Sequence, residues 1–241
     1  MKRISLFLAS LVMAVVAITI SGCNRFDCIS GSGNQVSQNR TLKPFTKIET
    51  SGSIELILKQ DSNQSVRIIA DDNIQNEIKT SVHGNTLEIK LDGNFCSAGP
   101  IKVYLTAKDF EGIDASGAVD ISSSGRLNVK DFSLDLSGSS KVSLDLNAAN
   151  LKTETSGSSE IILKGQAGSH HIDLSGSSDI EALDLVVGKY RIESSGASKA
   201  RINVLNSLYV NSTGSSDIEY RGNPSHVSNN ESGASSLKKI N

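Results

Sequence analysis

Residues Leu136–Ser140 read LSGSS, Thr155–Ser159 read TSGSS and Leu174–Ser178 read LSGSS, and a charged and an aliphatic residue follow each phrase. The glycine of this phrase, or of a close variant, recurs seven times at separations of 21, 19, 19, 20, 18 and 19 residues. The seven are Gly117, Gly138, Gly157, Gly176, Gly196, Gly214 and Gly233. A fixed period near twenty residues predicts a solenoid in which each unit stacks on the previous one.

The residues around each glycine alternate between apolar and polar. Positions six before, four before and four after the glycine are mostly apolar, as in Phe132, Leu134 and Val142, whereas the intervening positions are mostly polar. This period of two is typical of strands with one face in a core. Glycine reaches backbone angles that other residues adopt only at a cost, so we interpret the seven glycines as structural turns between two strands. The sequence thus predicts an all-β parallel β-helix with rungs of about 20 residues.

Residues 42–110 are rich in strand-like segments but less regular than residues 111–241. Ser51–Ser53 is an isolated first copy of the phrase, and Ile78–Val82 and Leu87–Leu91 flank a glycine-containing turn, which predicts a hairpin. We interpret 42–110 as an irregular lead-in to the solenoid or as a β-rich cap on its N-terminal end, and 42–241 as one domain.

The N-terminus reads as an export signal. Lys2 and Arg3 precede the apolar stretch Leu6–Ile20, and Ser21-Gly22 stand directly before Cys23. This order is similar to a bacterial lipobox, so we predict a signal peptide over 1–22, lipidation of Cys23 and a flexible tether over 23–41. No acidic run follows Cys23, which favours an outer-membrane lipoprotein that faces the periplasm over one on the cell surface.

Composition excludes some classes of protein and leaves the two remaining cysteines open. The net charge of −2 argues against a nucleic-acid partner, which requires a basic surface. In an exported protein Cys28 and Cys96 either form a disulfide that pins the tether to the domain or stay free. The histidines have no zinc-ligand spacing with cysteines, and we interpret His170-His171 as one inward and one outward residue of a strand.

The repeated phrases resemble those of one protein family. Leu136–Ser140, Thr155–Leu163, Leu174–Ile180 and Gly214–Pro224, with the opening Phe45–Leu56, are similar to the auto-transporter adhesin head GIN domain family. The resemblance covers about residues 42–240. It implies an exported bacterial protein, often a lipoprotein, built as a right-handed β-helix, with a role in adhesion and no catalytic residues to carry over.

One outward column of acidic residues is a candidate cation site. Three residues before successive glycines stand Asp114, Asp135, Glu154, Asp173 and Glu193. Such a column could bind Ca²⁺, because Ca²⁺ prefers oxygen ligands. The alternative is a solvated ladder whose charge is offset by Lys152, His171 and Arg191, two residues earlier on the same face.

We expect a non-enzymatic role in binding, adhesion or envelope interaction, with a membrane through the lipid anchor and an envelope protein or glycan as partners. A carbohydrate lyase or hydrolase is the alternative from another class, with Asp179, Glu181, Lys199 and Arg201 as its best cluster. A self-associating structural module, forming a homo-oligomer, is the third reading. No cofactor is expected apart from the calcium alternative.

Overall fold

The computed structural model describes residues 28–241, and these residues form strands and turns without a helix. It follows that the described part has no helix long and apolar enough to cross a membrane. The strands are β1 (Ile29–Ser30), β2 (Gln35–Arg40), β3 (Lys47–Gln60), β4 (Ser65–Asp71), β5 (Ile78–His83), β6 (Thr86–Leu91), β7 (Phe95–Ser97), β8 (Lys102–Ala107), β9 (Gly112–Gly138), β10 (Lys141–Gly157), β11 (Glu160–Gly176), β12 (Asp179–Gly196), β13 (Lys199–Gly214), β14 (Asp217–Arg221), β15 (His226–Gly233) and β16 (Ser236–Lys239).

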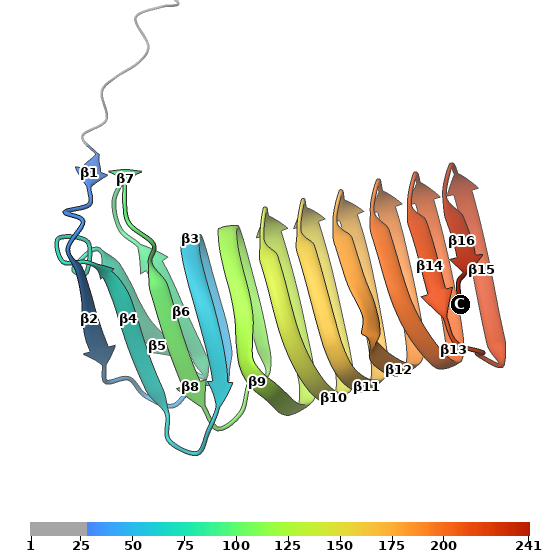
Figure 1. The fold of residues 1–241 in the computed structure, drawn as a ribbon, viewed down its shortest axis with the longest axis horizontal. Coiled ribbons are helices and arrows are strands. Elements are labelled where there is room, and N and C mark those ends of the chain that lie inside the picture. Colours follow the sequence, from blue (N-terminus) through green and yellow to red (C-terminus); the bar gives the residue numbers. More distant parts are fainter. Residues whose placement is uncertain (1–27) are drawn as a thin grey trace, which may run out of the picture.

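The long strands stack in parallel and in sequence order, which confirms the predicted β-helix. Neighbouring rungs pair residues about 19 apart, as in Val142↔Ile161 between β10 and β11. The solenoid has about six turns with rungs near 19 residues. Figure 1 shows β3 and β9 to β13 side by side as a row of bent ribbons, with β14 to β16 at the C-terminal end.

Each rung is bent into two halves that enclose the core between them. In β10 the inward residues run from Val142 to Ala148, then Ala149 and Asn150 are both exposed at a corner, and Leu151 resumes the alternation. We call the half that follows a glycine turn the leading sheet and the half that precedes the next glycine the trailing sheet. The inward positions are buried as expected in the central rungs, including Phe132, Leu134 and Ile161.

Successive rungs approach each other closely at the glycine turns. A Cβ on Gly117 would lie 2.7 Å from the carbonyl oxygen of Gly52, and one on Gly214 would lie 2.6 Å from that of Gly196. The same oxygens accept hydrogen bonds from the residue after the next glycine, as in Ser139 N to Gly117 O at 2.8 Å. A side chain at these positions would therefore displace both the turn and its hydrogen bond.

Serines two residues after the glycines form a buried polar seam along the turns. Ser159, Ser178 and Ser198 are each at most 3% exposed. The backbone N–H of Ser159 donates to Ser178 Oγ, and that of Ser178 donates to Ser198 Oγ, both at 3.3 Å. These bonds satisfy backbone groups that the turn leaves unpaired in the interior.

The N-terminal part is both a lead-in and a cap. β3 pairs in parallel with β9, and β6 and β8 in turn pair in parallel with the two halves of β3, so they continue the solenoid. β4 and β2 then add antiparallel strands beyond β8, and β5 closes the predicted hairpin with β6. These antiparallel strands cover the end of the core, where a parallel rung would have left it open.

The prediction of a flexible tether over 23–41 is wrong from Cys28 onward. β2 pairs along its whole length with β4, from Gln35↔Asp71 to Arg40↔Val66. Gln75 further fixes β2, because its side-chain amide donates to Val36 O at 2.9 Å. The polar composition hid this strand, since an edge strand needs backbone partners more than apolar side chains.

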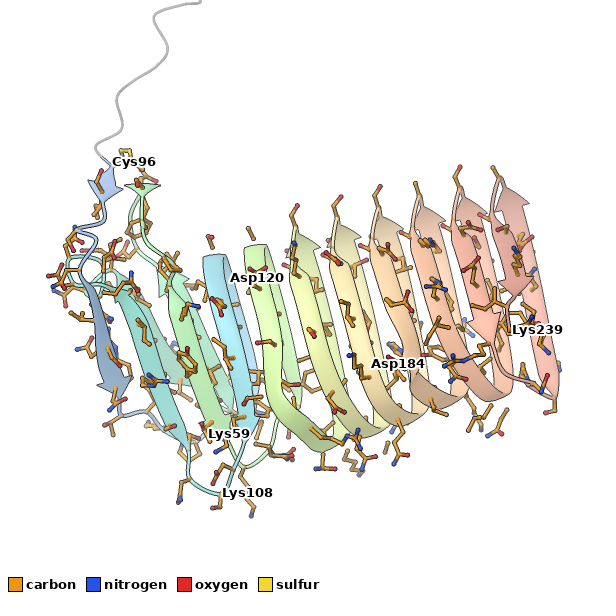
Figure 2. The ribbon with its side chains drawn as sticks, viewed as in Figure 1. Lys59, Cys96, Lys108, Asp120, Asp184 and Lys239 are labelled. Atoms are coloured by element: carbon orange, nitrogen blue, oxygen red, sulfur yellow. A yellow bond between two sulfur atoms is a disulfide. The ribbon has the colours of Figure 1, made fainter. Side chains whose placement is uncertain are left out.

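Cys28 and Cys96 are joined by a disulfide, with their Cα atoms 5.4 Å apart. Cys96 lies on β7, in the long connection between β6 and β8 that replaces the glycine turn of that rung. β1 pairs with β7 beside the disulfide (Figure 1), and Figure 2 shows Cys96 at the N-terminal end of the row. The chain is therefore fixed to the solenoid from Cys28 onward.

The C-terminal end is closed by polar residues rather than by extra strands. β15 is the last strand of the trailing sheet and β16 the last of the leading sheet, and on β15 Asn229 and Glu231 occupy inward positions and bond each other at 2.8 Å. Lys239, labelled in Figure 2, donates to Asn223 Oδ1 at 2.6 Å. Inward polar and charged side chains discourage another strand from pairing with a free edge.

The close approach at the turns predicts the effect of Gly214→Ala. Gly214 has a φ of +103° as well as the contact to Gly196, so the added methyl group meets both backbone strain and a clash. We expect the free energy of unfolding to fall by at least about 2 kcal/mol. Chemical denaturation would measure it, with Ser215→Ala, exposed at the same turn, as a control that should change little.

Candidate functional site

The acidic column predicted from the sequence lies on the outer surface of the trailing sheet. The registers pair Glu154 with Asp135 and with Asp173, and Asp173 with Glu193, so the carboxylates stack one per rung. The column extends further than expected, because Glu49 pairs with Asp114 and with Glu88. Sequence reasoning missed Glu49, although counting three residues back from Gly52 in the isolated first phrase finds it.

Cations compensate only parts of this column. Lys152 Nζ lies 2.7 Å from Glu154 Oε2, and Arg191 Nη2 lies 2.5 Å from Glu193 Oε1, as the spacing of two residues predicted. Lys90 pairs with Glu88 at the N-terminal end. Asp114 and Asp135 have no cationic partner within 4.0 Å among residues 28–241.

The unpaired carboxylates have raised pKa values. Partial burial is the main cause of the raised pKa of Asp114, and the neighbouring Glu49 adds to it. Burial also raises the pKa of Asp135, helped by Asp114 and Glu154 and opposed by Lys152. The centre of the column therefore holds more negative charge than its surroundings balance.

The column does not gather into a metal-binding group. Within the part of the chain that the structure describes, no three His, Cys, Asp or Glu side chains form a group that could hold a metal ion. The carboxylates follow one another along the stack, about 4.8 Å apart, instead of converging on one point. Calcium binding by this column stays a prediction.

A trough runs beside the acidic column, on the outer side of the trailing sheet. It is a hollow of about 710 Å³ near the corner between the sheets, and a second hollow of about 280 Å³ adjoins it. Lys47, Glu111 and Ser133 line both hollows, so together they form one depression, which we call the trough.

Small residues make the trough. Lys47, Gly112, Ser133, Lys152 and His171 occupy one column, five residues before successive glycines. Gly112 and Ser133 therefore leave a low floor between the long side chains of Lys47 and Lys152. The sequence contains this signal, since Gly112 and Ser133 are the small residues five positions before Gly117 and Gly138.

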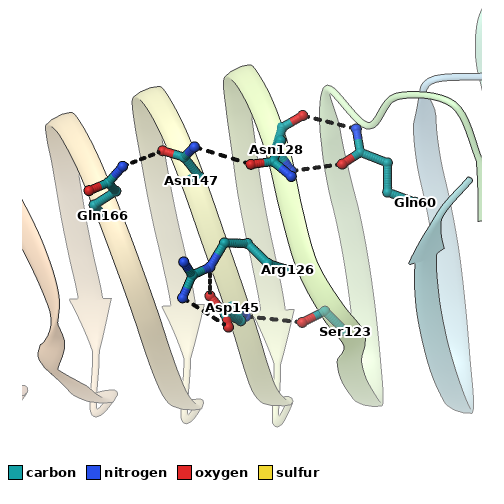
Figure 3. A network of polar contacts seen from close by, with 7 residues as sticks. All are labelled: Gln60, Ser123, Arg126, Asn128, Asp145, Asn147 and Gln166. Carbon is teal, nitrogen blue, oxygen red and sulfur yellow. Dashed lines mark hydrogen bonds and ion pairs between the residues drawn. The ribbon is translucent and has the colours of Figure 1, made fainter.

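A separate hollow of about 350 Å³ lies on the leading sheet. Ser122 and Ser143 form its floor, and Asp120, Lys141 and Glu160 are among its charged residues. Beside it the pairing of β9 with β10 is irregular, because Ser143 and Asp145 of β10 pair with Ser122 and Arg126 of β9. Figure 3 shows Ser123, Arg126 and Asp145 bonded at this point, next to a ladder of Gln60, Asn128, Asn147 and Gln166.

The cluster considered for an enzyme is held in ion pairs on the leading sheet. Arg201 Nη1 lies 2.9 Å from Glu181 Oε2, and Arg201 Nε lies 3.1 Å from Glu219 Oε2. These carboxylates raise the pKa of Arg201, Glu181 first. Asp179 and Lys199 are simply cross-strand neighbours. The arrangement thus has the geometry of a charged strand ladder.

His170 and His171 point to opposite sides, as expected. His170 is buried, its Nε2 lies 2.9 Å from Thr153 Oγ1, and its ring packs against Tyr190 with centroids 5.3 Å apart. Burial lowers the pKa of His170 to about 3, with a smaller effect of His171. His171 is half-exposed and lines the trough. The lipidation site, Cys23, lies outside the described residues.

Comparison with known families and structures gives one assignment for the domain. The family model described as "Putative auto-transporter adhesin, head GIN domain" matches residues 44–224. No curated protein matches the chain.

Several solved structures have a similar fold. A putative adhesin from Bacteroides fragilis has a TM-score of 0.85 at 23% identity, covering 88% of this chain and 100% of that one. A putative lipid binding protein from Parabacteroides distasonis has a TM-score of 0.71 at 21% identity, covering 89% of this chain and 100% of its own. A putative adhesin from Parabacteroides merdae has a TM-score of 0.69 at 20% identity, with the same coverages. At these identities the likeness concerns the fold.

The buried histidine predicts a pH dependence of stability. Because the pKa of His170 is about 3 in the folded chain and near 6.5 when unfolded, the unfolded state binds more protons between these values. Stability should then fall as pH drops below 6.5, by up to about 1.4 kcal/mol per pH unit. The paired variant Thr153→Val/His170→Leu should remove this component, measured by urea denaturation from pH 7 to 4. An unchanged slope would contradict it.

The unpaired carboxylates predict a pH dependence of stability opposite in sign to that of His170. A raised folded pKa means that Asp135 favours the folded state when protonated, so its contribution worsens as pH rises above its unfolded value. We expect Asp135→Asn to stabilise the fold at pH 7 by about 0.5 kcal/mol, with the gain vanishing near pH 3. Denaturation in EDTA tests the repulsion between the carboxylates, and denaturation in Ca²⁺ tests calcium binding. A calcium-dependent stabilisation lost in the variant would support a calcium site, and a less stable variant in EDTA would contradict the repulsion.

Proposed function

Because the chain belongs to the family described as Putative auto-transporter adhesin, head GIN domain, we propose that it is a non-enzymatic binding protein of the bacterial cell envelope. The observation that carries this is the trough, a polar depression in which Lys47, Lys130, Asp114 and Asp135 have no ion-pair partner within 4.0 Å among residues 28–241. Among the candidate catalytic charges, in contrast, Arg201 is engaged by Glu181, and by the neighbouring Glu219.

The proposal includes a lipid on Cys23 and a position on the periplasmic side of the outer membrane. The lipobox-like Ser21-Gly22-Cys23 supports the lipid, and the absence of an acidic run after Cys23 supports the periplasmic side. A membrane anchor is consistent with a rigid domain fixed from Cys28, because only residues 24–27 then separate the lipid from the disulfide.

The variant Cys23→Ala tests the anchor. We expect the parent chain in the membrane fraction and the variant in the soluble fraction, because the lipid supplies the membrane affinity. Cell fractionation and mass spectrometry of the N-terminal peptide measure this, with Cys28→Ser/Cys96→Ser as the matched control that should stay with the membrane. Equal membrane recovery of parent and Cys23→Ala would refute lipid anchoring.

The binding role and the enzyme alternative are separated by affinity capture. The purified full chain, immobilised in a zwitterionic detergent, should retain a component of an envelope extract without altering it. Incubation of captured material with fresh protein, followed by mass spectrometry, detects turnover. A shortened or cleaved product that disappears with Arg201→Met would favour the enzyme reading and overturn the proposal.

A further inference from the structure

The walls of the trough are held in place before any ligand arrives. On one side the Asn150 side-chain amide donates to Asp131 Oδ1 at 2.7 Å, and Ser169 Oγ donates to Asn150 Oδ1 at 2.8 Å. At the N-terminal end Asn85 Nδ2 donates to Glu111 Oε2 at 3.1 Å. Groups fixed in this way lose little freedom when they bind a partner, which favours affinity.

The trough presents groups of both signs. Lys47 and Lys130 have no ion-pair partner within 4.0 Å among residues 28–241, and Asp114 and Asp135 are likewise unpaired across the floor. An ammonium group only donates hydrogen bonds and a carboxylate only accepts them. A ligand that satisfies both must donate as well as accept hydrogen bonds, and a hydroxyl group does both.

An apolar ligand does not fit this depression. The apolar residues of its lining are each at most 3% exposed, so they belong to the core beneath the floor: Ile48, Ile113, Phe132 and Leu151. What a ligand meets is the polar layer above them: lysines, carboxylates, Asn150 and two serines.

An extended peptide is also a poor fit. Peptides commonly add to a free sheet edge or insert side chains into an apolar or aromatic groove. The trough lies on the face of paired strands β9, β10 and β11, whose backbone groups are bonded within the ladder. It therefore offers neither a strand edge nor accessible apolar pockets.

We propose that the trough binds a saccharide, whose hydroxyl groups donate to Asp114 and Asp135 and accept from Lys47 and Lys130. This inference rests on the proposed envelope-binding function and names the ligand class of that function. Gly112 and Ser133 leave the space in which the sugar ring lies, and the hydrogen-bonded Asn150 and Asp131 form the fixed wall beside it.

The test replaces a small residue on the floor of the trough by a large one. Ser133 lies on the outer side of β9, half-buried, so Ser133→Tyr projects a ring into the trough without entering the core. The full chain in zwitterionic detergent is screened on a glycan array, and the best soluble oligosaccharide found there is titrated by calorimetry. We expect Ser133→Tyr to weaken binding at least tenfold.

A matched control distinguishes the trough from the separate hollow on the leading sheet. Ser143→Tyr makes the same change in the separate hollow on the leading sheet, and this variant should bind the saccharide like the parent chain. Lys47→Met/Lys130→Met keeps side-chain length while removing two donors, and should also weaken binding if Ser133→Tyr proves unstable. Thermal unfolding of each variant shows whether it is folded.

Several results would overturn the proposal. No array glycan binding the parent chain, or equal affinity in parent and Ser133→Tyr, would rule out a saccharide in the trough. If Ser133→Tyr still captures the envelope component, the protein binds elsewhere and only the trough assignment fails. If it loses capture of a protein while the array stays negative, the trough binds a polypeptide instead.

Discussion

The fold depends on the contact between stacked backbones at the glycine turns. There the carbonyl oxygen of one glycine lies too close to the next glycine to leave room for a Cβ, as at Gly117 over Gly52, where the distance would be 2.7 Å. Only residues without a side chain allow the rungs to close to strand-pairing distance at a sharp corner. The serine seam behind the glycines then supplies hydrogen bonds inside the turn. These turns fix the register of the strands. The register then determines on which side of the sheet each side chain lies.

A scaffold of this regularity turns sequence columns directly into surface columns. Charges of like sign gather in one line from Glu49 to Glu193, and the cations that balance them gather in the next line. A site arises where a column is interrupted. At Gly112 and Ser133 the cation column loses its long side chains for two rungs, which leaves both a depression and unbalanced carboxylates at Asp114 and Asp135.

The sequence was sufficient to predict the fold class, the inward and outward positions and the hairpin of β5 and β6, because each rests on a local period. It was not sufficient for β2, whose residues are polar and which owes its order to pairing with β4, thirty residues away along the chain. It predicted the acidic column but not its extension to Glu88, since β6 reaches β3 through an irregular connection. The trough was not predicted for a related reason. Its floor is formed by glycine and serine, which do not stand out as functional groups in a sequence.

The two ends of the solenoid are closed in different ways, which affects how such a protein can evolve. Antiparallel strands close one end and inward polar residues close the other, while each middle rung contacts only its two neighbours. Duplication or loss of one 19-residue unit between β11 and β13 would leave both closures and the trough intact. The reach of the molecule can thus be altered in whole-rung steps by gene slippage, independently of what it binds.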